Sequence, residues 1–95
     1  MQVATAFEKD ASARMIIGPQ IRAARALLGW SGADLARRAG ISYPTVQRAE
    51  TATGIPGMRI YNLIALKLAL EAGGVIFLDQ GELRDGGPGV RLPRS

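Results

Sequence analysis

Glycine and capping residues divide residues 18 to 50 into three short segments of helical length. Pro19 stands where the first turn of a helix tolerates proline, and Ser31 and Ser42 are each placed to cap a following helix. Gly29 and Gly40 stand where the first two of these helices would stop, because glycine adopts the left-handed conformation of a helix end at no steric cost. The pattern predicts helices over residues 19–28, 32–39 and 43–50.

Apolar periodicity resumes after a loop rich in Thr, Gly and Pro at residues 51–57. A fourth helix is expected over residues 58–72, with apolar side chains over more than half of its circumference. Such a wide apolar surface exceeds what one small domain covers, so we assign part of it to a homodimer contact. Val75–Leu78 is a short β-type run. Val90–Leu92 is expected to pair with it as a hairpin, or to form a strand across a dimer.

The length of 95 residues is that of one small domain, since chains this short seldom form two separate cores. Residues 1–16 mix small and charged residues without periodicity, and we expect a flexible tail. Residues 17–74 hold the four expected helices and form the domain proper. Residues 75–95 are expected to be a β extension, rich in Gly and Pro, that either dimerises or is partly disordered.

The sequence contains no Cys and no His, which restricts its chemistry. The usual zinc sites, thiol nucleophiles, Ser-His triads and disulfide frameworks each need one of these residues. The carboxylates form no pair suited to acid–base catalysis. We therefore expect no enzyme activity, no metal site and no cofactor.

Charged residues also argue against a membrane or secreted protein. Lys67 and Glu71 interrupt the longest apolar stretch, well short of the about 20 residues that a membrane-spanning helix needs. Glu8, Lys9 and Asp10 stand where a secretory signal would need an uninterrupted apolar run. A chain without Cys suits a reducing compartment. We expect a cytoplasmic protein with no membrane partner.

The positive charge of the chain is confined to its central part. Lys and Arg number 12 and Asp and Glu number 8, and the resulting excess of +4 lies entirely in residues 19–59. Every cation of that segment is Arg, which suits bidentate contact with phosphate or with a base edge better than Lys does. An ordinary solvated helix face is the alternative, and charge alone does not separate the two.

Two short helices joined by a tight turn containing glycine, the second with a capped polar first turn, can place a helix in the major groove of DNA. The residues that mark this arrangement, in order and without gaps, are Leu28-Gly29, Ser31, Leu35-Ala36, Ala39-Gly40-Ile41-Ser42, Val46 and Glu50. This set resembles the helix-turn-helix of the XRE family, the regulators related to phage repressors and Cro proteins. The resemblance covers residues 17–53. It implies an all-α fold of four to five helices like a phage-repressor DNA-binding domain, followed here by a short C-terminal β-strand or hairpin.

The resemblance also assigns roles to single residues. The matching recognition helix is residues 43–50, and the residues that would face the DNA bases are Tyr43, Pro44, Thr45, Gln47 and Arg48. Those that would contact phosphate are Arg22, Ser31, Gly32, Arg37 and Arg38. Arg48 is the expected base reader, since its guanidinium can donate to O6 and N7 of guanine. Ser31 and Gly32 would act through backbone N–H groups at a helix start.

Two further positions relate to the family pattern. Members pair an Arg of the first helix with the Glu that ends the recognition helix, and Arg25 and Glu50 occupy those positions. Many members carry Gln at the first position of the second helix, where this chain has Gly32. A side-chain contact to phosphate and a support for the recognition helix are therefore missing, and we expect modest affinity.

The expected function is that of a bacterial transcriptional regulator that binds double-stranded DNA as a homodimer. A repressor is the simpler expectation, because no effector or activation domain fits in the chain. Two alternatives stay open. An antitoxin of a toxin–antitoxin pair would bind its operator and also cap a toxin. A protein-binding module would use the same scaffold to sequester another regulator.

Overall fold

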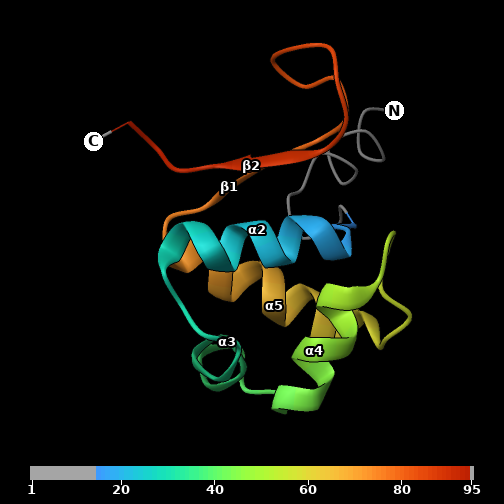
Figure 1. Cartoon of the computed structure of the whole chain (residues 1–95), viewed down its shortest axis with the longest axis vertical. Helices are drawn as coiled ribbons and strands as arrows, with labels where there is room; N and C mark the ends of the chain where they lie inside the picture. Colours follow the sequence, from blue (N-terminus) through green and yellow to red (C-terminus); the bar gives the residue numbers. More distant parts are fainter. Residues whose placement is uncertain (1–14, 95) are drawn as a thin grey trace, which may run out of the picture.

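The computed structural model describes residues 15–94, which form four helices followed by a two-stranded antiparallel sheet (Figure 1). The elements are α2 (Gly18–Leu28), α3 (Gly32–Ala39), α4 (Tyr43–Thr51), α5 (Ile60–Ala72), β1 (Ile76–Leu78) and β2 (Gly89–Arg91). In Figure 1, α2 lies between the β-hairpin and the other three helices. The mainly helical fold with a short C-terminal hairpin, predicted from the sequence, is confirmed.

The helix boundaries expected from the sequence differ from the observed ones by at most two residues. The largest difference is at α5, which begins at Ile60 and not at residue 58. Arg59 has an extended backbone (φ −62°, ψ 140°), and the amide of Met58 donates to the carbonyl oxygen of Pro56, so both residues belong to the loop. The two strands pair within the chain, with Phe77 opposite Val90, so the hairpin alternative holds for this chain.

The N-terminal tail expected over residues 1–16 includes a residue that belongs to the core. Ile16, two residues before the start of α2, is buried and packs in the core. Residues 1–14 lie outside the described part of the chain. The core consists of Ile16, Ile21, Ala24, Leu35, Ala36, Val46, Ala49, Leu63, Leu66, Leu70 and Val75.

Side-chain caps define the start of α3 and α4. The hydroxyl of Ser31 accepts a hydrogen bond from the Asp34 amide (3.0 Å), and the Asp34 carboxylate accepts one from the Ser31 amide (2.9 Å). The bond from the Ser31 amide, followed by one from Arg37, holds the pKa of Asp34 below its ordinary value. Ser42 caps α4 in the same way, accepting from the amide of Thr45 (3.2 Å). Both caps satisfy N–H groups that a helix start leaves unpaired.

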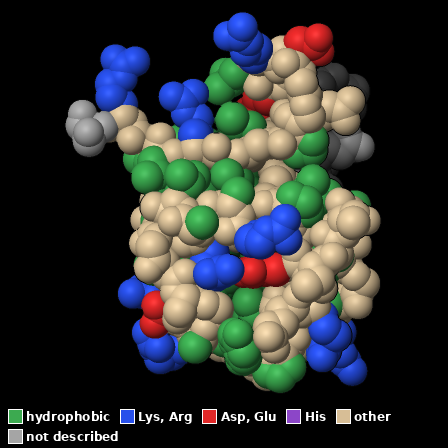
Figure 2. All heavy atoms as spheres, viewed as in Figure 1, with side chains coloured by type: hydrophobic (Ala, Val, Ile, Leu, Met, Phe, Trp, Pro, Cys, Tyr) green, Lys and Arg blue, Asp and Glu red, His purple; other side chains and the backbone are tan. Residues whose placement is uncertain are grey.

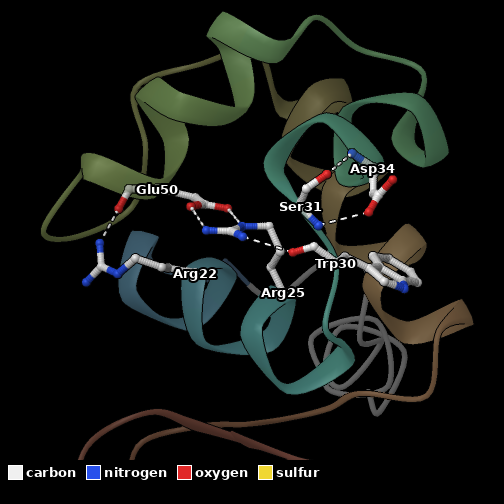
Figure 3. Close-up of polar contacts among 6 residues, drawn as sticks. All are labelled: Arg22, Arg25, Trp30, Ser31, Asp34 and Glu50. Carbon is white, nitrogen blue, oxygen red and sulfur yellow. Dashed lines mark hydrogen bonds and ion pairs between the residues drawn. The ribbon is translucent and has the colours of Figure 1, made fainter.

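An ion pair fastens the end of α4 to α2 (Figure 3). The Arg25 guanidinium donates to both carboxylate oxygens of Glu50, at 2.6 Å from Nε and 3.0 Å from Nη2, and also to the carbonyl oxygen of Trp30 (2.9 Å). The side chains are 24% and 11% exposed, so water reaches the pair only in part. The hydrogen bond to Glu50 raises the pKa of Arg25, and the guanidinium stays charged.

Two more contacts hold α2 and α4 together. Arg22 donates to the carbonyl oxygen of Glu50 (2.8 Å), near the C-terminal end of α4, where carbonyl groups lack partners within the helix (Figure 3). The first turn of α2 also approaches α4 closely at Gly18, where a Cβ atom would collide with the carbonyl oxygen of Ala52. The close approach therefore requires glycine at position 18.

The buried side chain of Gln20 fastens the hairpin to the opposite side of α2. Gln20 is only 6% exposed, and its amide nitrogen donates to the carbonyl oxygens of Leu78 (3.2 Å) and Gly89 (3.0 Å), which face each other in the hairpin register. Its amide oxygen accepts from the amide of Ile17 (3.0 Å) at the start of α2. All the hydrogen-bonding groups of this amide side chain are thus used within the fold.

Replacing Glu50 by Ala should destabilise the protein, because Arg25 would then be left as a largely buried charge without its partner. We expect a loss of about 1.5 to 3 kcal/mol in the free energy of unfolding, below the figure for a fully buried pair because water partly reaches the site. Urea unfolding followed by circular dichroism measures this loss. Glu71→Ala, on the half-buried side of α5, is the matched control; equal stability of the two variants would contradict the prediction.

Replacing Gln20 by Glu should loosen the hairpin while leaving the helices in place. A carboxylate cannot donate to the carbonyl oxygens of Leu78 and Gly89 and would instead repel them, at a cost of about 1 to 3 kcal/mol. Hydrogen exchange measured by NMR should show faster exchange for the β1 and β2 amides and a smaller change for α3. Gln80→Glu makes the same chemical change at an exposed loop position. Unchanged protection of the hairpin in Gln20→Glu would show that Gln20 does not hold it.

Candidate nucleic-acid interface

Helices α3 and α4 lie on the side of the molecule opposite the hairpin and are joined by a tight turn (Figure 1). Gly40 adopts the left-handed conformation (φ 72°), and the amide of Ile41 donates to the carbonyl oxygen of Ala36. Ser42 follows at once as the cap of α4. A single residue, Ile41, thus separates the glycine that ends α3 from the serine that caps α4, and this short turn sets the direction of α4 relative to α3.

The five residues expected to face bases all lie in the first two turns of α4. Tyr43, Pro44, Gln47 and Arg48 are exposed, and Thr45 is half-buried. Two intervening residues, Val46 and Ala49, are buried in the core, as their spacing predicts. The structure thus brings the base-reading candidates together on the outer face of one helix, and that face is open to a large partner.

Polar contacts run along the outer side of α4. The hydroxyls of Ser42 and Thr45 are 2.7 Å apart, and Arg48 donates to Thr45 Oγ1 at 3.3 Å. The Arg48 contact is long, and within residues 15–94 its guanidinium forms no ion pair. Its remaining donors are free to bind an acceptor from outside the chain.

Gly32 and Tyr43 form a contact between the starts of α3 and α4 that the sequence did not reveal. A Cβ atom at position 32 would lie 2.6 Å from Cε1 of the Tyr43 ring, so the ring occupies the space that a side chain on the first residue of α3 would fill. The absence of a side chain at Gly32 is therefore matched by an aromatic ring from the recognition helix. The Tyr43 ring thus packs against the start of α3.

The five residues expected to contact phosphate are spread over three places. Ser31 and Gly32 are at the start of α3. Arg37 pairs with Asp34 (3.1 Å) yet keeps 67% of its side chain exposed, and the Arg38 guanidinium lies 4.2 Å from the centre of the Trp30 ring. Arg22 is bound to α4 through the carbonyl of Glu50. In the view of Figure 2, Lys and Arg side chains lie around the α3–α4 end of the molecule and again on the hairpin.

Sequence reasoning missed two residues that lie beside the outer face of α4. Arg59 and Asn62, at the start of α5, line a cavity of about 230 Å³ together with Thr45 and Arg48 of α4. The available signal was an Arg placed directly after the Gly- and Pro-rich loop, where a new helix begins. The position of Arg59 relative to α4 depends on the path of that loop. The loop has no sequence periodicity from which its path could be predicted.

The matches to known proteins agree with this geometry. A helix-turn-helix family model matches residues 21–73, more than half of the chain and the segment that contains α3, α4 and α5. No curated protein was found to match the chain. Within residues 15–94, no helix has the length and apolar character needed to cross a membrane. The capped helix pair, the exposed outer face of α4 and the family match together show that the chain belongs to the XRE family of helix-turn-helix DNA-binding regulators.

Proposed function

We propose that the protein is a sequence-specific repressor that binds double-stranded DNA as a homodimer and reads the major groove with α4. The observation that carries the proposal is the outer face of α4, where Tyr43, Pro44, Gln47 and Arg48 are exposed while the opposite face is fixed to α2 and α3. An α-helix of this kind fits the major groove. Occupation of a promoter is itself sufficient to repress, because it blocks access of the polymerase.

Arg48 is the residue that we assign to base recognition. Its guanidinium is exposed and has one long contact, to Thr45. Arg22 and Arg25, by contrast, donate to Glu50 inside the domain. Of the arginines on α2 and α4, Arg48 is thus the one that is bound neither to Glu50 nor to a backbone carbonyl, which leaves donors available for a bidentate contact to guanine.

Phosphate contacts are assigned to the start of α3 and to its arginines. The backbone N–H group of Gly32 suits an oxygen of the DNA backbone, and the start of a helix carries positive partial charge. The N–H of Ser31 already donates to the Asp34 carboxylate (2.9 Å) and would have to exchange that partner for a phosphate. Arg37 is exposed and could exchange its contact with Asp34 for a phosphate. Arg38 is held over Trp30, which restricts the directions it can reach. Arg22, bound to α4, contributes charge and not a flexible contact.

The homodimer is assigned to one side of α5. Tyr61, Ile64 and Leu68 follow one another at helical spacing, and Tyr61 and Leu68 are 76% and 50% exposed. Ile64 between them is half-buried, so the three residues form a continuous apolar stripe. Burial of this stripe against a second copy would remove apolar surface from water and place two copies of α4 in a symmetric arrangement.

The first test separates the two kinds of arginine. Arg48→Ala should cost about 1 to 3 kcal/mol on the preferred duplex and relax one base position, whereas Arg37→Ala should weaken binding to all duplexes alike. Fluorescence anisotropy with the preferred and a scrambled duplex measures both, and wild-type affinity should fall steeply as salt rises. Arg91→Ala, on the hairpin, controls for the loss of one charge. A uniform loss in both variants would place the recognition helix elsewhere, and a flat salt dependence would favour the sequestering module.

The second test addresses the homodimer. Sites selected from random duplex DNA should contain an inverted repeat with half-sites about 34 Å apart, because a two-fold dimer presents two recognition helices one turn of DNA apart. Leu68→Glu should produce monomers in sedimentation velocity and abolish the preference for the repeat. Leu83→Glu, at an exposed position of the hairpin loop, is the control. Selected sites without dyad symmetry, or a monomeric wild type, would contradict the dimer.

A further inference from the structure

A cavity of about 230 Å³ lies between α4, the loop of residues 52–59 and the start of α5. It shares Thr45 and Arg48 with the outer face of α4, while Arg59 and Asn62 enclose it from the other side. Two arginines, one from each side, therefore line the same space, together with a threonine and an asparagine.

The charges around the cavity are all of one sign. None of the described residues that line it is acidic. The guanidinium of Arg59 forms no hydrogen bond or ion pair within the part of the chain that the structure describes, and Arg48 has its single long contact to Thr45. Two like charges facing one cavity repel each other, and an anion between them would remove that repulsion. Guanidinium groups bind carboxylates and phosphates through paired hydrogen bonds, to which Thr45 and Asn62 can add.

The size and the remaining walls of the cavity indicate more than a bare ion. At about 230 Å³ the cavity has room for several water-sized groups. Ala49, Pro56 and Met58 give it an apolar wall. Small-molecule sites commonly combine such a wall with a few convergent polar groups.

We propose that this cavity binds a small organic anion, a carboxylate or a phosphate monoester that carries a short apolar group, and that the bound anion competes with DNA for Arg48. The binding itself is independent of the function proposed above, whereas the competition rests on it. Arg48 links the two, because its guanidinium lines the cavity and also lies on the face of α4 assigned to DNA. A phosphate of the DNA strand offers the same oxyanion without the apolar group, so the experiment must distinguish the two sources.

The test uses the full chain and three probes: phenyl phosphate, inorganic phosphate and phenol. Calorimetric titration should show one site for phenyl phosphate, with weaker binding of inorganic phosphate and no binding of phenol. Arg59→Gln removes one charged donor at an exposed position and should weaken phenyl phosphate binding about tenfold to a hundredfold. Arg91→Gln removes the same charge from the hairpin and should leave the binding unchanged. Asn62→Leu provides a second variant from the cavity wall and should also weaken it.

Competition is measured by the anisotropy of a labelled duplex. At constant ionic strength, phenyl phosphate should release the duplex from the wild type and from Arg91→Gln, whereas release from Arg59→Gln should need about tenfold to a hundredfold more of it. Three results would overturn the proposal: no heat of binding, equal binding by wild type and Arg59→Gln, or release no greater than that caused by matched sodium chloride. The proposal would also be overturned if inorganic phosphate bound and competed as strongly as phenyl phosphate. The cavity would then be a binding site for a phosphate of the DNA backbone. Binding of phenyl phosphate by a protein that binds no duplex would refute the proposed function and leave the cavity site standing.

Discussion

Glu50 is the residue on which the position of α4 depends. Its carboxylate accepts two hydrogen bonds from Arg25, and its own carbonyl oxygen accepts one from Arg22, so both its side chain and its main chain are held by α2. The carboxylate is mostly buried, and a buried charge is stable only when it is paired. Apolar packing alone could not fix the position of α4 as precisely, because the apolar residues that α4 buries, Val46 and Ala49, are small.

The helix that holds Glu50 also holds the hairpin. Within two turns, α2 directs Gln20 to the strands and Arg22 and Arg25 to α4. Gly18 allows the first of these turns to lie directly against the end of α4. Both attachments consist of polar contacts with defined geometry, which restrict rotation and sliding of α2 more than apolar side chains would. The hairpin and α4 are therefore positioned by one element, although they lie on opposite sides of it.

Local signals in the sequence predicted the helices well because each boundary is a local event. Ser31, Ser42, Gly29 and Gly40 cap or end their helices through contacts within a few residues. The contacts of Gln20 were not predicted, since they join residues 58 and 69 positions apart, although a polar residue on the apolar stripe of α2 was a signal. The cavity lined by Arg59 escaped prediction for the same reason, because an irregular loop positions it. The roles in DNA recognition came from family resemblance and not from any physical pattern.

The contact between Gly32 and Tyr43 makes two positions on different helices behave as one unit in evolution and in design. Any larger residue at position 32 would displace the Tyr43 ring, and a smaller residue at position 43 would leave a gap above the start of α3. An exchange at position 43 would therefore change the space available to a side chain at position 32. Sequences related to this chain should show glycine at the first site together with an aromatic at the second, and libraries built to redirect its specificity should vary the two together.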